Sequence, residues 1–124
     1  MNPALDAKGL PAGYPFKPDF EVTPREVRDL LKSGSVYLID CRSSAEAAAA
    51  RIAGARLIPL DDLARQVEEI EAAAGERPIV VHCHMGGRSL KAAIYLRNRG
   101  LNATSMAGGI DLWSVDVDPG VPRY

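Results

Sequence analysis

The chain has 124 residues, 47% of them apolar, and a formal net charge of -1 at neutral pH. This length suffices for one hydrophobic core and excludes a second full domain. The balanced charge excludes the global positive field that attracts nucleic acid or an anionic membrane. We therefore expect no nucleic-acid or membrane partner, and any anion must bind locally.

The first predicted unit is an extended arm over residues 1–20. Its prolines and glycines resist both helix and sheet: Pro3, Gly9, Pro11, Gly13, Pro15 and Pro18. The arm is either a disordered leader or a segment packed across the domain that follows over residues 21–124. It has neither the basic start nor the apolar core of a signal peptide, and no membrane-spanning run follows, so we expect a cytoplasmic protein.

Two capping boxes mark the starts of helices. Thr23 precedes Glu26 by three residues, and Ser43 stands in the same relation to Glu46. The first helix is predicted to end at Gly34, and the second, an alanine-rich helix, ends before Gly54.

Four continuous apolar runs predict buried strands at residues 36–40, 55–58, 79–81 and 103–106. Helical patterns lie near residues 63–75, from 88 to 99, and around Trp113. Strands that alternate with helices, each a continuous apolar run, indicate a parallel sheet covered on both faces. The predicted fold class is α/β.

The octet HCHMGGRS (residues 82–89) follows the third of these strands. It is similar to the phosphate-binding signature of cysteine phosphatases, in which five residues separate the cysteine from the arginine. Here four residues separate Cys83 from Arg88. The question is whether this loop binds phosphate or a smaller group.

Cys83 is the predicted catalytic residue. In open parallel sheets the active site lies beyond the carboxyl ends of the strands, which is where Cys83 stands. Loop glycines and the next helix N-terminus form an anion cradle that lowers the pKa of a thiol and makes it nucleophilic at neutral pH. The predicted substrate-binding residues are His84, Met85, Gly86, Gly87, Arg88 and Ser89.

The four-residue spacing favours a bowl that holds one sulfur atom over a wider ring that holds a phosphoryl group. The outer sulfur of a persulfide carries a single negative charge, which inward amides can stabilise without a clamp on three oxygens. A phosphatase or arsenate reductase is the less favoured alternative, because the spacing is short and no aspartic general acid is evident.

Several separated motifs then resemble the single-domain rhodanese (thiosulfate sulfurtransferase) family. They are DCR with the following Glu46, AGARLIPLDDL at residues 53–63, VVHCHMGGRS at residues 80–89, and AGGIDLW at residues 107–113. The resemblance implies transfer of a sulfane sulfur through a Cys83 persulfide, without a cofactor. The implied partners are a small sulfur-donor anion and a thiol acceptor. A sulfur-relay protein with a protein donor or acceptor remains open.

The remaining polar residues near the loop are interpreted as structural. Asp40 and Arg42 end a strand, and Arg42 is expected to reach back to Glu46. His82 and His84 flank the thiol without zinc-site spacing, so no metal is expected, and His84 is expected to face solvent or substrate.

Cys41 leaves two interpretations open. The favoured one is a small buried hydrophobe at the end of its strand. The alternative is a resolving thiol for an oxidised Cys83, since the resemblance places the two cysteines on neighbouring strands.

Overall fold

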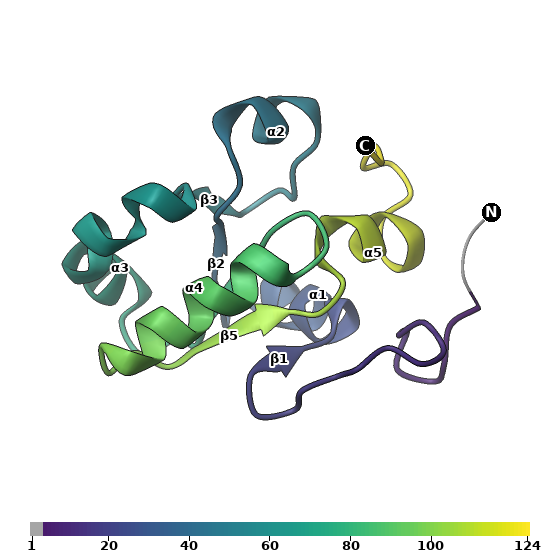
Figure 1. Cartoon of the computed structure of the whole chain (residues 1–124), viewed down its shortest axis with the longest axis horizontal. Coiled ribbons are helices and arrows are strands. Elements are labelled where there is room, and N and C mark those ends of the chain that lie inside the picture. Colours follow the sequence, from purple (N-terminus) through teal and green to yellow (C-terminus); the bar gives the residue numbers. More distant parts are fainter. Residues whose placement is uncertain (1–3) are drawn as a thin grey trace.

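The computed structural model describes residues 4–124. Its centre is a five-stranded parallel sheet in the order β1-β5-β4-β2-β3 (Figure 1). The strands are β1 (Glu21–Val22), β2 (Tyr37–Asp40), β3 (Arg56–Leu57), β4 (Ile79–His82) and β5 (Ala103–Met106). The crossed strand order brings the carboxyl ends of β2 and β4 together, because these two strands pair in register from Tyr37 with Ile79 to Asp40 with His82.

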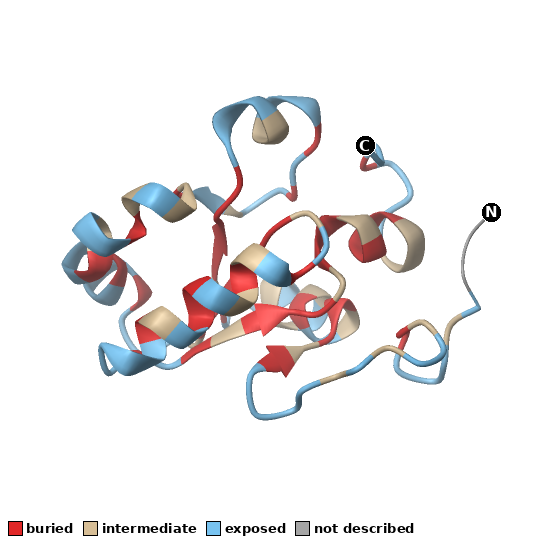
Figure 2. Ribbon diagram, viewed as in Figure 1, coloured by how far each residue is buried: buried red, intermediate tan, exposed pale blue. Residues whose placement is uncertain are grey.

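Helices cover both faces of the sheet, which confirms the predicted α/β class. The helices are α1 (Pro24–Lys32), α2 (Ser44–Ala49), the 3-10 helix η1 (Leu60–Gln66), α3 (Val67–Ala74), α4 (Gly87–Asn98) and α5 (Gly109–Asp116). Helix α2 has no buried residue and does not cover the sheet. Side chains of η1, α3 and α4 pack in one core cluster, and those of α1 and α5 in another. Figure 2 shows that the buried residues follow the strands and the inner sides of these helices.

The two faces of β4 carry different residues. Val81 and Cys83 belong to the cluster under η1, α3 and α4, and Val80 belongs to the cluster under α1 and α5. Alternate side chains of a strand point to opposite faces, so His82 shares the side of Val80. His82 is fully buried, and this burial lowers its pKa, which keeps the imidazole neutral.

Both predicted capping boxes are present. The side chains of Thr23 and Ser43 accept from the backbone of Glu26 and Glu46, and each glutamate returns a contact to its cap. Three elements differ from the sequence prediction. Strand β3 covers only Arg56–Leu57 of the predicted residues 55–58, and both residues are exposed rather than buried. The edge strand β1 has two residues, too few for a period-2 pattern. Residues 60–66 form a 3-10 helix, which the apolar spacing does not distinguish from an α-helix.

The N-terminal segment packs across the domain from residue 4 onward. Leu10, Tyr14 and Phe16 form a small cluster with Ala107 and Leu112, beside the start of α5. Within residues 4–124, no helix is both long and apolar enough to cross a bilayer.

A buried ion pair closes the end of β2. The guanidinium of Arg42 is inaccessible to solvent and donates to both carboxylate oxygens of Asp40, at 2.8 and 2.7 Å. It also donates to the carbonyl of Ala50 at 2.6 Å, just beyond α2. Arg42 therefore ties the segment that follows β2 to the far end of α2.

Removal of this cation should destabilise the fold. Because Arg42→Met leaves Asp40 buried without a counter-charge, we expect a loss of about 3–5 kcal/mol in the free energy of unfolding, measured by urea denaturation. The double variant Asp40→Leu/Arg42→Met should lose much less than the sum of its two single variants. Additive losses would show that the pair is not coupled.

Candidate active site

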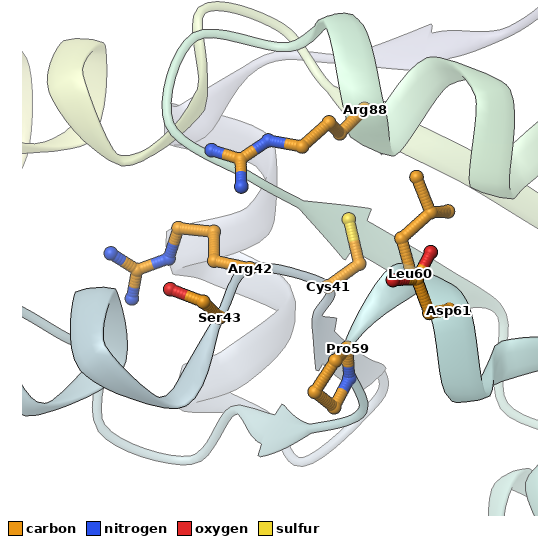
Figure 3. A pocket seen from close by; sticks show the side chains of 7 residues that line it. All are labelled: Cys41, Arg42, Ser43, Pro59, Leu60, Asp61 and Arg88. Carbon is orange, nitrogen blue, oxygen red and sulfur yellow. The ribbon is translucent and has the colours of Figure 1, made fainter.

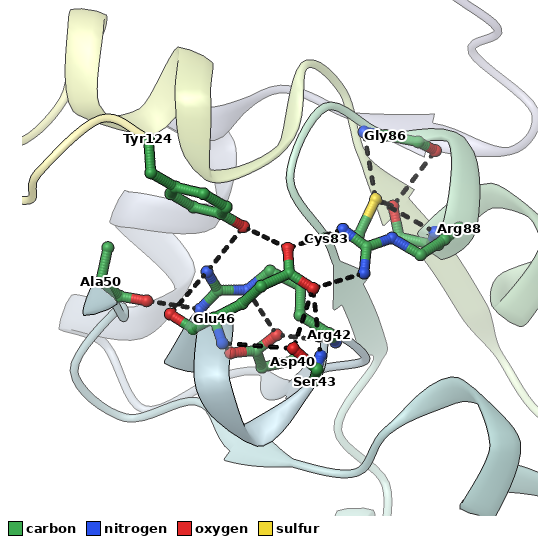
Figure 4. Close-up of polar contacts among 10 residues, drawn as sticks. Asp40, Arg42, Ser43, Glu46, Ala50, Cys83, Gly86, Arg88 and Tyr124 are labelled. Atoms are coloured by element: carbon green, nitrogen blue, oxygen red, sulfur yellow. Dashed lines mark hydrogen bonds and ion pairs between the residues drawn. The ribbon is translucent and has the colours of Figure 1, made fainter. Parts of the chain in front are cut away.

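Cys83 directly follows β4, and its sulfur lies at the N-terminus of α4. The backbone N–H groups of Gly86 and Ser89 donate to Cys83 Sγ at 3.1 and 3.3 Å (Figure 4). Helix α4 has no side-chain cap at its N-terminus. The sulfur therefore takes the position of an N-cap acceptor and lies at the positive end of the helix dipole.

Glycines determine the path of the loop. Gly86 has a φ of 114°, in the region that L side chains rarely adopt. Gly109, at the start of α5, has a φ of 62°, and a Cβ there would overlap the carbonyl oxygens of Cys83 and His84. The α5 amides of Ile110 and Asp111 bind those carbonyls at 2.9 and 3.1 Å. Helix α5 thus holds the loop carbonyls on the side away from the sulfur.

Two buried hydroxyls extend the polar surroundings of the thiol. Ser89 Oγ lies 3.3 Å from Cys83 Sγ and 2.7 Å from Ser105 Oγ. When Cys83 is a thiolate, Ser89 donates its proton to the sulfur and accepts one from Ser105. Ser105 lies on β5, so this strand supports the thiolate through Ser89 of α4.

The surroundings lower the pKa of the Cys83 thiol from its ordinary value of 9.0 to about 4. The largest cause is the neighbouring Cys41 thiol. Burial acts in the opposite direction, and the Ser89 hydroxyl with the Ser89 and Gly86 amides adds to the lowering. The pKa of Cys41 is strongly raised by the adjacent Cys83 and by burial, so Cys41 keeps its proton. One thiolate and one thiol share this site.

Arg88 is held by Glu46 of α2. Its guanidinium makes a bidentate ion pair with the carboxylate, at 2.7 and 2.9 Å, and this pair lowers the pKa of Glu46. Arg42, which was expected to reach Glu46, does so through a long 3.4 Å contact with the backbone carbonyl. The Glu46 carboxylate pairs instead with Arg88, while two of the Arg42 nitrogens, Nε and Nη2, bind Asp40.

Tyr124 contacts both Arg42 and Glu46. Its hydroxyl accepts from Arg42 at 3.0 Å and donates to Glu46 at 2.6 Å (Figure 4). Its ring stacks on His84, with 4.1 Å between centroids and 15° between planes. Tyr124 thus covers one side of the half-buried His84, and the expectation that His84 faces solvent or substrate stays a prediction. Its neighbour Met85 is 64% exposed.

A pocket of about 220 Å³ opens beside the loop. It is lined by Cys41, Arg42, Ser43, Pro59, Leu60, Asp61 and Arg88. Figure 3 shows the Cys41 sulfur pointing into this pocket, below Arg88. Cys83 is 1% exposed and is not among the lining residues. Cys41 therefore stands at the wall of the pocket, next to the sulfur proposed to react.

Sequence reasoning missed three residues that complete the site. Ser105, Tyr124 and Tyr14 come from three distant segments, and no local motif connects them to the loop. The Tyr14 hydroxyl accepts from the N–H of Gly108 and donates to Glu21, at 3.0 and 2.9 Å. Burial and Glu21 raise its pKa to about 12, so it remains a neutral donor. Within residues 4–124, no group of three or more His, Cys, Asp and Glu side chains is arranged to hold a metal ion.

Comparisons with known proteins agree with this arrangement. Residues 23–116 match the model of the rhodanese-like domain. The chain is 37% identical to the human thiosulfate:glutathione sulfurtransferase, over 71% of this chain and 87% of that protein. It is 35% identical to the probable adenylyltransferase/sulfurtransferase MoeZ of Mycobacterium tuberculosis, over 83% of this chain. The matched region spans about a quarter (26%) of MoeZ, so the likeness concerns one part of that protein.

A solved structure is also similar to this chain in fold and in sequence. The human single-domain sulfurtransferase TSTD1 superposes with a TM-score of 0.65 and 35% sequence identity, over 75% of this chain and 93% of that one. The fold, the cysteine loop at the end of β4 and the family match over most of the chain lead to one conclusion: the chain belongs to the rhodanese-like family of sulfurtransferases.

Proposed function

We propose that this protein moves a sulfane sulfur from thiosulfate, or from a persulfide donor, to a thiol or other nucleophilic acceptor. The carrier is a persulfide on Cys83. The observation that carries this proposal is the set of contacts at the sulfur, where two backbone amides and a hydroxyl surround an atom with a strongly lowered pKa. A thiolate is the nucleophilic form of cysteine, and it is present here at neutral pH.

The reaction has two steps. The Cys83 thiolate attacks the outer sulfur of thiosulfate, the bond between the two thiosulfate sulfurs breaks, and sulfite leaves with the electron pair. An acceptor thiolate then attacks the outer sulfur of the Cys83 persulfide, and the Cys83 thiolate leaves. This is covalent ping-pong catalysis, in which the loop amides stabilise one negative charge on sulfur at each stage.

The Arg88–Glu46 pair favours a singly charged persulfide at the loop over a dianionic group that stays bound there, such as phosphate or arsenate. A dianionic phosphoryl group needs a cation free to make a bidentate contact. The Arg88 guanidinium is already paired bidentately with Glu46, and this pair neutralises its charge. A persulfide carries a single charge, which the amides of Gly86 and Ser89 can bind without Arg88.

A sulfur relay is the second candidate. Its chemistry at Cys83 is the same, but the donor or the acceptor is a protein. The similarity to MoeZ favours it, because that protein's name joins a sulfurtransferase to an adenylyltransferase. Exposed Met85, at the tip of the loop, provides an apolar contact next to the site. Turnover with small thiols distinguishes the first candidate from a relay that needs a protein partner.

The first test replaces the nucleophile. Cys83→Ser should abolish sulfur transfer from thiosulfate to cyanide or a thiol, because an alcohol of high pKa cannot form the persulfide. Steady-state assays of thiocyanate and sulfite would measure this, and circular dichroism would verify that the variant is folded. Retained turnover in a folded variant would rule out the assignment.

The pH dependence gives a second test. Because the pKa of Cys83 is lowered to about 4, the thiolate predominates at higher pH and is lost when the pH falls below that value. The rate of sulfur uptake from thiosulfate should therefore be flat through neutral pH and fall in acid with a midpoint near 4. Ser89→Ala should move this midpoint upward, since it removes a donor to the sulfur. A rate that rises near the ordinary cysteine pKa of 9.0 would contradict the lowered pKa.

Loop length is tested by insertion of one glycine between Gly86 and Gly87. The insertion restores the five-residue spacing and widens the bowl, so thiosulfate turnover should fall while phosphate or arsenate gains affinity. Protection of Cys83 from alkylation by these oxyanions would measure that gain. Unchanged thiosulfate turnover would show that loop length does not select the substrate.

A further inference from the structure

Cys41 is a buried thiol that the sulfur-transfer steps do not use. It follows β2 directly, as Cys83 follows β4, and the two strands pair in register up to Asp40 and His82. The pairing continues one residue further, because the N–H of Cys41 donates to the carbonyl of His82 at 3.0 Å. The two cysteines thus leave neighbouring parallel strands at the same level.

The two sulfurs also lie on the same face of the sheet. Both cysteines belong to the core cluster under η1, α3 and α4, and both are free thiols. Neighbouring strands lie about 4.8 Å apart, and disulfides form between residues whose Cα atoms are about 4.4–6.8 Å apart. Each thiol also perturbs the pKa of the other, as expected for side chains in contact. The register and the shared face therefore suit a bond between the two cysteines.

We propose that Cys41 is a resolving thiol that discharges the Cys83 persulfide as hydrosulfide when no acceptor arrives. This inference rests on the proposed persulfide chemistry and adds a second outcome to it. It also assigns Cys41 a chemical role, where the sequence favoured a small buried hydrophobe.

The step balances without an external oxidant. Cys41 Sγ attacks Cys83 Sγ, a Cys41–Cys83 disulfide forms, and the bond from Cys83 Sγ to the outer sulfur breaks. The electron pair goes to the outer sulfur, which also receives the Cys41 proton and leaves as hydrosulfide. In this step Cys41 is oxidised and the departing sulfur is reduced, while Cys83 Sγ keeps the oxidation level that it reached when the persulfide formed. A dithiol reductant then restores both thiols.

The pocket is compatible with transfer of the sulfur to an acceptor and with its release as hydrosulfide. Cys41 lines the pocket beside Arg88, so an anion that enters the pocket lies next to the Cys41 side chain, although Cys41 and Cys83 are only 2% and 1% exposed. In the resting protein the raised pKa of Cys41 keeps it protonated, so it donates toward the Cys83 thiolate and does not compete with it for the donor. The persulfide supplies the electrophilic sulfur that Cys41 requires.

The test is a single-turnover experiment without acceptor, under anaerobic conditions. Wild-type protein, Cys41→Ala and Cys41→Ser each receive one equivalent of thiosulfate, and in parallel one equivalent of inorganic polysulfide. Intact mass, free sulfide and non-reducing peptide maps are followed over time. Serine is the matched control, because it keeps the size and polarity of Cys41 but cannot form a disulfide.

We expect wild-type protein to gain one sulfur and then lose it as sulfide, with a Cys41–Cys83 cross-link that a dithiol reverses. Once loaded, both Cys41 variants should keep the added sulfur on Cys83 and release sulfide at least about tenfold more slowly, and Cys41→Ala should load more slowly than the serine variant because it lacks the side-chain donor that lowers the pKa of Cys83 most. A persulfide that persists equally in all three proteins would overturn this inference and leave the proposed function intact. If neither donor loads Cys83 in any of the three, both proposals fail.

Diamide treatment of resting protein tests the geometry separately. It oxidises dithiols without a persulfide, so a Cys41–Cys83 disulfide should form in high yield. Disulfides between two molecules, with Cys41 still reduced, would contradict the proposed proximity.

Discussion

A negative charge on one buried sulfur is the constraint on which this site depends. A thiolate removed from water is costly, and burial alone raises the pKa of Cys83. The fold compensates with the neighbouring Cys41 thiol, the Ser89 hydroxyl, and the amides of Ser89 and Gly86 at the N-terminus of α4. Each of these donors belongs to the backbone or to a buried side chain, so little reorganisation is needed when the charge moves to an outer sulfur.

The surrounding structure serves to keep those donors turned inward. Helix α5 binds the carbonyls of Cys83 and His84, and Gly109 permits that close approach. On the opposite side, Glu46 holds Arg88 and is itself held by Tyr124. The chain thus uses its cation to fix the loop against α2, and it uses backbone dipoles to bind the reacting sulfur. A site that binds its substrate through backbone dipoles and keeps its cation in an ion pair suits a singly charged persulfide better than a phosphoryl group.

The helix starts and the position of the candidate catalytic cysteine were predictable from local sequence. The capping boxes at Thr23 and Ser43 depend on residues three apart, and the position of Cys83 follows from the rule for parallel sheets. The ion-pair partner of the Glu46 carboxylate was not predictable, because the chain offers both Arg42 and Arg88 and the sequence does not show how the fold places them. The contacts of Tyr14, Ser105 and Tyr124 arise from tertiary packing between distant segments, for which this sequence contains no local signal.

The most direct test of the central claim is a crystal structure of the Cys41→Ser protein after treatment with thiosulfate. The account predicts one additional sulfur bonded to Cys83 Sγ and enclosed by the loop amides between Met85 and Ser89, with Arg88 still paired to Glu46. An intact oxyanion bound to Arg88 with Glu46 displaced, and no sulfur added to Cys83, would contradict it.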